Sequence, residues 1–383
     1  MLLAVYATHA SASKGRLVKE PESPTRTVYQ RDRDRIIHCG AFRRLRNKTQ
    51  VFIESEGDYF RTRLTHSLEV SQIARTIARQ LQVDEDLTEA LALAHDLGHT
   101  CFGHAGEKAL DESMQPFGGF DHNEQTFRIL TLLEKRYAAF DGLNLTWETL
   151  EGVVKHNGPL KEVRPSFAAF SKKWDLELKT HAGLEAQIAA LSDDIAYNTH
   201  DFDDGFRAGF FVLNELAELP IFSAIVKQSL HNYPDIERHR LIQEIVRQAI
   251  GFLIADLLIE TRHRLQEINP QSAEEVRKAG KPLVSFSAPV VDGLNTLREF
   301  LMNRMYRHSK VNVMNQWAGR VVTGLFGRFM ADPALLPPEW QREWAQKDAS
   351  DKALRARLVA DYVAGMTDRF AETEYKRLFT NEA

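Results

Sequence analysis

Apolar residues recur every three or four positions along most of this chain, which is the spacing of one face of an α-helix. Strand-like alternation of apolar and polar residues is scarce. One regular series leads directly to the pair His95-Asp96, and its apolar members are Val70, Ile73, Ile77, Leu81, Leu87, Leu91 and Ala94. The pattern therefore predicts an all-α fold in which a polar pair lies at the end of a buried helix.

Glycine and proline indicate where the expected helices end. Gly98 predicts a helix stop after His95-Asp96, and Phe102-Gly103 leads into a second helical start at His104. Helical spacing returns over residues 184–203 and 239–266. Breaks rich in Pro and Gly fall at 116–119, 158–165, 280–289 and 333–338. We therefore expect helices joined by short connections throughout the chain.

The composition is that of a globular protein, with 383 residues, 43% hydrophobic and 27% charged. Two cysteines provide no disulfide framework, which favours a reducing compartment. The opening residues are too short for a signal-peptide apolar region, and no apolar stretch approaches the roughly 20 residues of a membrane span. We therefore expect a cytoplasmic protein with no membrane partner. A net charge of −4 argues against bulk binding of nucleic acid.

Basic residues are nevertheless concentrated near the start, where only Asp32 and Asp34 accompany them. One interpretation is a phosphate-binding surface. The other is a set of ion pairs within the chain or between subunits, because arginine is favoured at such contacts. Both interpretations stay open for the cations Arg26, Arg31, Arg33, Arg35, Arg43, Arg44, Arg46 and Lys48.

The pair His95-Asp96 is the first candidate for chemistry. An adjacent His and Asp point to opposite faces of a strand, but near a helix end both can lean toward one site. A lone pair of this kind is more often a capped helix end beside scattered polar residues. His66 and Asp193 bring the set to two imidazoles and two carboxylates, donors that suit Mn, Mg, Fe, Ni or Zn.

A divalent ion in such a site favours hydrolysis of phosphate esters, since the ion can activate water and polarise a phosphoryl group. The sequence has no Gly-x-x-x-x-Gly-Lys-Ser/Thr run. Phosphates would therefore be held by the metal and by side chains such as Arg63. From the residues alone, the prediction is a metal-dependent phosphoester hydrolase.

Three segments surround the candidate ligands with a more specific pattern: Arg61–Val70, Ala94–Glu107 and Leu191–Asn198. The chain resembles the deoxyguanosinetriphosphate triphosphohydrolase-like family of the HD-domain superfamily. The resemblance runs from about Pro21 to Asp204, with a fainter likeness over Leu297–His308. Further segments that carry it are Pro24–Arg26, Arg31–Ile37 and Lys48–Phe52. One departure is Cys101, which stands where the family usually has proline.

The resemblance implies a helical HD core with a helical C-terminal extension. It divides the chain into a basic N-terminal segment with substrate or oligomer contacts (1–60), the metal-dependent core (61–205) and the extension (206–383). The family's metal ligands fall on His66, His95, Asp96 and Asp193. Asp194 competes with Asp193, which is preferred because the family's sugar-contacting tyrosine and aspartate then fall one and two helical turns later.

The remaining site residues are also assigned by the resemblance. His104, Glu107 and His122 match the catalytic, proton-transferring group, and a spacing of three on a helix lets His104 and Glu107 meet. Gln50, Val51, Tyr197 and Asp201 match positions around a deoxyribose, and Arg46 and Arg63 complete the expected substrate contacts. His99, four residues after His95, is left out of the site as well, with a supporting position behind the ligands as its one candidate role. We expect His156, His181 and His200 in loops or on the surface, outside the site.

These assignments predict a metal-dependent deoxynucleoside triphosphate (dNTP) triphosphohydrolase, which would release the deoxynucleoside and tripolyphosphate. The resemblance also implies a homo-oligomer, and it admits a nucleotide effector or single-stranded DNA as a partner. Three alternatives stay open. They are an HD phosphohydrolase of other nucleotides, a single-strand nuclease with the same metal site, and a non-catalytic nucleotide- or DNA-binding regulator.

Overall fold

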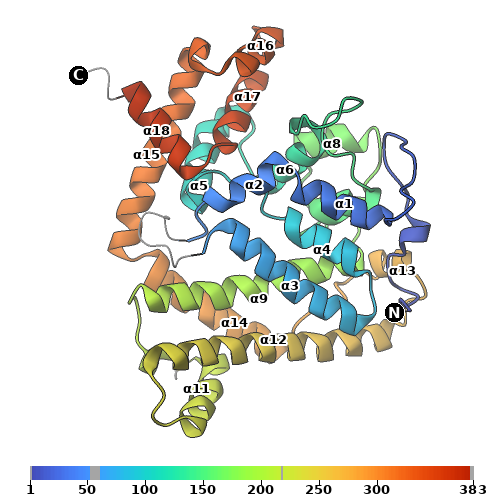
Figure 1. The fold of residues 1–383 in the computed structure, drawn as a ribbon, viewed down its shortest axis with the longest axis vertical. Helices are drawn as coiled ribbons and strands as arrows, with labels where there is room; N and C mark the ends of the chain where they lie inside the picture. The colour runs from blue at the N-terminus through green and yellow to red at the C-terminus, as the bar shows by residue number, and fades with distance from the viewer. Residues whose placement is uncertain (1, 52–60, 217–218, 380–383) are drawn as a thin grey trace.

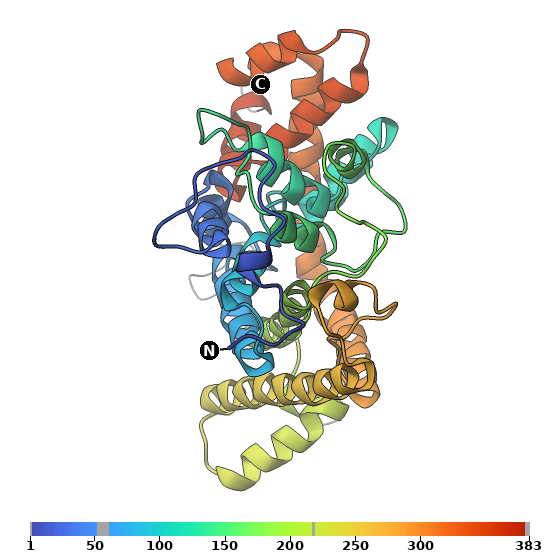
Figure 2. The same ribbon diagram turned by 90° about the vertical axis from the view of Figure 1, so that its right-hand side faces the viewer.

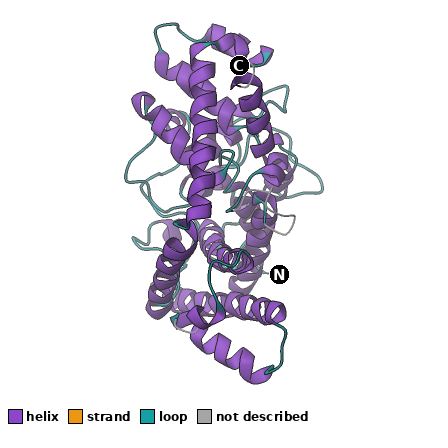
Figure 3. Ribbon diagram, turned by 90° about the vertical axis from the view of Figure 1, so that its left-hand side faces the viewer, coloured by secondary structure: helices purple, strands orange, loops and turns teal. Residues whose placement is uncertain are grey.

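The computed structural model describes residues 2–51, 61–216 and 219–379. Within these ranges the chain is helical and has no β-strand (Figure 3). Isolated bridges pair Arg16 with Thr146 and Thr49 with Thr62. The all-α prediction is confirmed. Part of the predicted basic segment, residues 52–60, lies outside the described residues, and with it Phe52 of the family pattern.

The first half of the chain contributes nine α-helices within the described ranges. They are α1 (Val28–Ile37), α2 (Gly40–Arg44), α3 (Arg63–Leu81), α4 (Glu85–Ala94), α5 (Gly103–Met114), α6 (His122–Arg128), α7 (Trp147–Val154), α8 (Pro165–Ser171) and α9 (Leu184–Arg207). Two short helical segments also matter for the sites below: η2 (Leu45–Asn47) and η5 (Ile129–Leu133).

The second half is helical as well. Its helices are α10 (Leu213–Leu216), α11 (Pro220–Asn232), α12 (Arg238–Ile268), α13 (Ala273–Arg277), α14 (Ala288–Leu301), α15 (Ser309–Ala331), α16 (Pro338–Gln346), α17 (Lys352–Ala364) and α18 (Asp368–Phe379). The π-helical segment η6 (Met302–Tyr306) joins α14 to α15. No helix of the described chain is long and apolar enough to cross a membrane.

Helices α3, α4 and α9 form the centre of the molecule, with α1 against α4 (Figure 1). Their predicted apolar stripe is buried. It is divided between two helices, because Gln82 adopts a left-handed backbone with φ of 55° and ends α3. Asp84 then caps α4 by accepting a hydrogen bond from the amide of Leu87 at 2.9 Å. The turn redirects the chain so that α4 carries His95 back to the first turn of α3.

The segment between α4 and α5 is fixed by close backbone packing. A Cβ atom added to Gly98 would lie 2.1 Å from the carbonyl oxygen of His122 and 2.2 Å from the amide nitrogen of Thr126. Phe102 has a left-handed backbone with φ of 59°, and α5 begins at Gly103, one residue before the predicted start. The helix stop predicted at Gly98 thus places the turn directly against α6.

Two apolar cores hold the molecule together. The larger extends from Ala7 to Val311 and includes residues of α11, α12 and α14 beside those of α3, α4 and α9. The smaller joins α5 to α15, α17 and α18 (Figures 1 and 2). The predicted boundary at residue 205 falls inside α9, which continues to Arg207. The division into three domains stays a prediction.

Candidate functional site

Three helices bring the predicted metal ligands to one point. The first turn of α3 carries His66, the residues after α4 are His95 and Asp96, and α9 carries Asp193. Asp193 Oδ1 lies 2.9 Å from His66 Nε2 and 3.5 Å from His95 Nε2. Asp96 Oδ1 lies 3.3 Å from His95 Nε2. The quartet that the sequence predicted is therefore assembled in space.

The environment of His95 suits a cation. Its Nδ1 lies 2.6 Å from the carbonyl oxygen of Ala92, which only accepts hydrogen bonds, so Nδ1 carries a proton. Its Nε2 is buried and has no hydrogen-bond partner among the described residues. Burial acts to lower the pKa of His95, but the carboxylates of Asp96 and Asp193 raise this pKa to about 9. A proton and a divalent cation would compete for this nitrogen, so the donor set fits a metal ion.

Asp96 and Asp193 face the cluster as carboxylates. Burial acts to raise both pKa values, but the charge of His95 and further neighbours hold them well below the usual range. For Asp96, one neighbour is the buried Arg63, whose Nη1 lies 2.8 Å from Asp96 Oδ2. The carboxylate of the rival Asp194 binds Nη2 of Arg298 at 3.0 Å. The geometry therefore favours Asp193 over Asp194 as the fourth candidate ligand.

Glu107 organises the predicted proton-transfer group. Its Oε1 accepts a hydrogen bond from the amide of His122 at 2.9 Å and lies 2.6 Å from His122 Nδ1, whereas its Oε2 lies 3.4 Å from His104 Nδ1. Burial acts to lower the pKa of His122, yet Glu107 raises it. Burial acts to raise the pKa of Glu107, yet His104 and His122 hold it well below the usual range. Glu107 is therefore an anion, and His122 is its closer partner.

His99 lies between the two clusters. Its Nε2 is 3.2 Å from Asp96 Oδ1, its Nδ1 is 3.8 Å from Glu107 Oε2, and its ring stacks on His122 with centroids 4.0 Å apart. Burial is the main cause that lowers the pKa of His99 well below its usual value, so the ring is neutral. The supporting position that we expected for His99 agrees with this geometry.

A cavity of about 230 Å³ adjoins both clusters. Among the predicted substrate residues it reaches Gln50, Arg63 and Tyr197. Gln50 Oε1 and two nitrogens of Arg63, Nε and Nη2, are buried without a hydrogen-bond partner in the described structure. The residues around the cavity are Gln50, Arg63, His66, His95, Asp96, His99, His104, His122, Asn123, His156, Asn157, Asp193, Asp194 and Tyr197.

Three predicted substrate residues do not line this cavity. Arg46 is exposed on η2. Val51 is half-buried and packs against the larger apolar core. Asp201 is buried behind the cavity, where its Oδ2 accepts a hydrogen bond from Tyr306 and its Oδ1 has no partner among the described residues. Tyr306 also lies 2.7 Å from Tyr197, hydroxyl to hydroxyl.

Two predictions were wrong: that His156 lies outside the site, and that His200 lies in a loop or on the surface. His156 lines the cavity and stacks on His95 with centroids 5.5 Å apart, and its Nε2 lies 3.6 Å from Asp193 Oδ2. His200 is buried on α9 with its Nδ1 3.5 Å from Nδ1 of His66. A sequence signal existed for His156, because it follows a short apolar helix, α7, much as His95 follows α4.

Much of the basic N-terminal segment is paired within the chain. Arg26 binds Asp34, Arg33 reaches Asp86, and Arg35 binds Glu20 at 2.8 Å. Lys48 is buried, and its ammonium donates to the carbonyl oxygens of His99 and Ala364. For Arg26, Arg33 and Arg35 the ion-pair interpretation is confirmed. Lys48 makes neither an ion pair nor a contact with the candidate cavity in the described structure.

Comparison with known proteins places these features in a family. The family model described as "HD domain" matches residues 63–198, and the one described as "Phosphohydrolase-associated domain" matches residues 284–377. Three curated relatives are called "Deoxyguanosinetriphosphate triphosphohydrolase-like protein". They are 56% identical in Parvibaculum lavamentivorans, 53% in a Caulobacter species and 52% in a Bradyrhizobium species, each over 98% of this chain and 96% of the relative. A crystal structure of a hypothetical protein from Aquifex aeolicus is more distant, with 17% identity and a TM-score of 0.37 over 91% of this chain and 71% of that one.

Proposed function

The chain belongs to the deoxyguanosinetriphosphate triphosphohydrolase-like family of HD-domain phosphohydrolases, and we propose that it hydrolyses dNTPs to the deoxynucleoside and tripolyphosphate with the help of a divalent metal ion. The observation that carries the proposal is that one cavity adjoins the His/Asp quartet, the Glu107 cluster and Gln50 with Tyr197. Metal, proton-transfer and sugar-recognition groups would then act on one bound molecule.

In this proposal His66, His95, Asp96 and Asp193 hold the cation. The cation would supply Lewis-acid polarisation of the phosphate at which water attacks. Arg63 would bind phosphate oxygens, because Asp96 occupies only one of its nitrogens and the other two are buried without a partner among the described residues. Charge-assisted hydrogen bonds of this kind are favoured where water is excluded.

Proton transfer would fall to His104 and His122. Glu107 orients His122 through Nδ1 and stabilises its protonated form, so His122 can give a proton to the leaving O5′. His104 has a 65% exposed side chain and lines the opening of the cavity, where it can hold the attacking water. The neutral His99 lies between Glu107 and Asp96 and keeps these two carboxylates at a fixed separation.

Gln50, Tyr197 and Asp201 would select the sugar. Gln50 Oε1 lacks a partner among the described residues and can bond a hydroxyl of the sugar. Asp201 lies behind the cavity and would act on the sugar through the hydroxyls of Tyr306 and Tyr197. Burial, followed by the charge of Asp204, raises the pKa of Asp201 well above its usual value. Val51 and Arg46 lie outside the cavity. They would contact a bound nucleotide only where it extends beyond the rim of the cavity.

The proposal is tested by product analysis with dGTP, GTP and 2′,3′-dideoxy-GTP, each with Mn²⁺ and with Mg²⁺. We expect free tripolyphosphate from dGTP and a kcat/KM ratio of dGTP to GTP of about 100 or more. Gln50→Ala should lose the penalty for the missing 3′-hydroxyl. Asn47→Ala is the matched control, because Asn47 is an exposed residue of η2, outside the cavity.

Other outcomes would redirect the assignment. Orthophosphate or pyrophosphate as the first product would contradict departure of O5′ from the α-phosphorus. Equal efficiency on GTP and dGTP would leave a general nucleotide hydrolase. Cleavage of a labelled single-stranded oligonucleotide, without turnover of dNTPs, would indicate a nuclease.

A further inference from the structure

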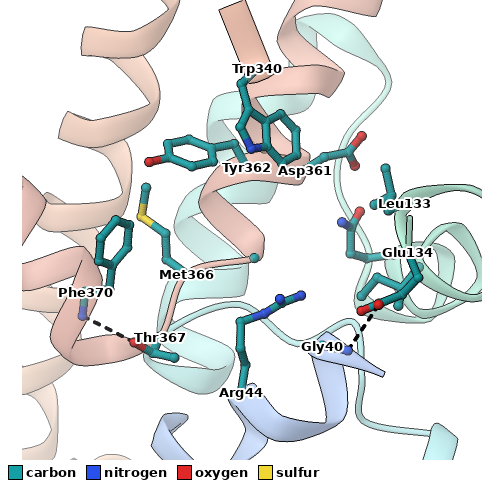
Figure 4. Close-up of a pocket in the computed structure, with 13 residues that line it drawn as sticks. Gly40, Arg44, Leu133, Glu134, Trp340, Asp361, Tyr362, Met366, Thr367 and Phe370 are labelled. Carbon is teal, nitrogen blue, oxygen red and sulfur yellow. Dashed lines mark hydrogen bonds between the residues drawn. The ribbon is translucent and has the colours of Figure 1, made fainter. Parts of the chain in front are cut away.

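A second cavity, of about 520 Å³, lies between the N-terminal helix α2 and the C-terminal helices α16 to α18 (Figure 4). It shares no lining residue with the cavity at the metal ligands. Its volume is in the range of sites for small organic ligands. The lining residues are Gly40, Arg44, Gln125, Ile129, Leu133, Glu134, Trp340, Asp361, Tyr362, Gly365, Met366, Thr367 and Phe370.

Flat aromatic side chains form one wall of this cavity. Trp340 and Tyr362 have ring centroids 5.2 Å apart, and Met366 and Phe370 continue the wall toward α18 (Figure 4). Phe370 is 44% exposed, an unusual state for a phenylalanine inside a cavity lined by other apolar groups. Aromatic faces and methionine sulfur favour stacking with planar rings.

The acidic residues of the cavity are already satisfied. Glu134 accepts hydrogen bonds from the amides of Gly40 at 3.1 Å and Ala41 at 2.8 Å, at the start of α2. Asp361 binds Arg128 and Arg357, whose Nε atoms lie 3.1 and 3.2 Å away. These carboxylates therefore have little capacity left for a cationic ligand.

Arg44 differs from the acidic residues of the cavity in its charge and in its lack of an ion-pair partner in the described chain. It extends from α2 into the cavity, between Met366 and Glu134 (Figure 4). Its Nε is buried without a hydrogen-bond partner, and Arg44 forms no ion pair with any acidic residue of the described chain. The neighbouring Lys48 has its pKa lowered to about 7, mainly by burial and next by the charge of Arg44. Because the oxygens of Glu134 accept from the amides of α2, the N–H groups of Arg44 stay available to an anion in the cavity.

We propose that this cavity is a binding site for a planar aromatic anion, with the ring against Trp340, Tyr362 and Phe370 and the anionic group on Arg44. A carboxylate fits the geometry of the guanidinium fork, and a single fused ring system fits the volume. The site is independent of the candidate metal centre and of the proposed hydrolysis.

The test compares two probes of nearly equal shape, naphthalene-1-carboxylate and the neutral 1-naphthamide, by titration calorimetry with the full-length protein. Wild type should bind the carboxylate more tightly by about tenfold or more, the usual contribution of a charged hydrogen bond. Arg44→Met should reduce this preference to about one, and its affinity for the amide should stay unchanged because the apolar stem is kept. Arg43→Met is the matched control, since Arg43 is exposed and does not line the cavity.

Trp340→Ala tests the aromatic wall. It should weaken both probes by a similar factor, on the order of tenfold for one lost stacking surface. All variants must keep the wild-type thermal midpoint, and only variants that do so are compared. The proposal is overturned by wild type that fails to bind either probe, by equal affinity of wild type for the two probes, by a preference that survives in Arg44→Met, or by unchanged affinity in Trp340→Ala.

Discussion

The two ring nitrogens of His95 face different partners. Nδ1 is tied to the carbonyl oxygen of Ala92, and Nε2 is buried beside carboxylates without a hydrogen-bond partner among the described residues. Backbone carbonyls commonly fix the tautomer of a ligating histidine in this way. The arrangement follows from the end of α4, because the carbonyl of the last helical turn has no other partner there.

Asp193→Ala should remove the metal ion. Within the described chain Asp193 contacts histidines and no arginine, so its loss leaves no buried guanidinium unpaired. The fall in metal affinity should exceed the roughly 10–100-fold that loss of a supporting residue causes. Asp194→Ala is the matched control, because Asp194 binds Arg298 and not the cluster. Elemental analysis of both purified variants checks this, and full metal content in Asp193→Ala would contradict the assignment.

Asp96→Ala is a less informative test of metal binding than Asp193→Ala. Asp96 also pairs with the buried Arg63, and breaking a buried ion pair by removing one partner costs about 3–5 kcal/mol. Loss of metal and loss of stability would therefore occur together in that variant.

The pair of His122 and Glu107 should make stability depend on pH. The raised pKa of His122 means that its contribution is complete below about 6.5 and is lost as pH rises through the folded-state value. The lowered pKa of Glu107 gives a contribution that is present above about 4.5 and lost only as pH falls through its folded-state value. The difference in unfolding free energy between wild type and Glu107→Gln should therefore shrink from pH about 6 to about 9.

Denaturant unfolding across this range measures the difference. Glu112→Gln is the control on the same helix, since Glu112 is exposed and its only described ion pair is with Lys108 at 4.0 Å. A difference that does not change with pH would show that Glu107 does not stabilise a protonated His122.

Residue types in a family pattern could be predicted, but their partners could not. His66, His95, Asp96 and Asp193 were found because their spacing matches a known motif. His156 was placed outside the site because it lies in a polar turn far along the chain, and only the packing of α7 against α4 brings it to His95. Sequence distance carries no information about such a contact.

At the scale of elements, the turn between α4 and α5 determines the position of both clusters. Gly98 in this turn packs directly against the backbone of α6, which begins with His122. The apolar periodicity predicted the helices on either side. The left-handed backbone of Gln82 and the α6 contact could not be predicted, because a glutamine rarely adopts that conformation and a packing contact leaves no period in the sequence.

Gly98→Ala should therefore destabilise the protein and slow turnover together. The added methyl group would overlap backbone atoms of His122 and Thr126, which cannot move as a side chain can, and the cost should be about 3 kcal/mol or more. Gly251→Ala on α12 is the control. Nothing lies within 4 Å of its added Cβ, so the better helix propensity of alanine should stabilise the protein by up to about 1 kcal/mol. A thermal or denaturant melt measures the stability of each variant, and kcat measures the turnover of Gly98→Ala. An unchanged melt for Gly98→Ala would contradict this packing.

At the scale of the whole molecule, the C-terminal helices hold the segment that carries Gln50. Asp368, the first residue of α18, accepts hydrogen bonds from the amides of Thr49 at 2.9 Å and Phe102 at 2.8 Å. Lys48 donates to the carbonyl oxygen of Ala364 at the end of α17. The sequence predicted a helical extension packed on the core. These hydrogen bonds could not be predicted, because aspartate at a helix start is ordinarily read as a cap.

Asp368→Ala should leave buried donors on Thr49 and Phe102 without a partner, at a cost of about 3 kcal/mol. We expect a higher KM for dGTP with unchanged metal content, because Gln50 loses its support and the ligands do not. Asp348→Ala is the control, since Asp348 is exposed and within the described chain its side chain accepts hydrogen bonds only from Ser350. The stability of this control should stay within about 0.5 kcal/mol of wild type. Loss of metal from Asp368→Ala would contradict this separation.

The hydrogen bonds of Asp368 also bear on how the protein is made. The ribosome has added all four candidate ligands once residue 193 is in place, yet Lys48 and Thr49 still lack their partners on residues 364 and 368. At about 5–20 residues per second, this interval lasts on the order of ten to thirty seconds. During this interval the segment that carries Gln50 lacks the hydrogen bonds that Ala364 and Asp368 give it. Under the proposed function, selection of the sugar would therefore depend on helices that are synthesised long after the metal ligands.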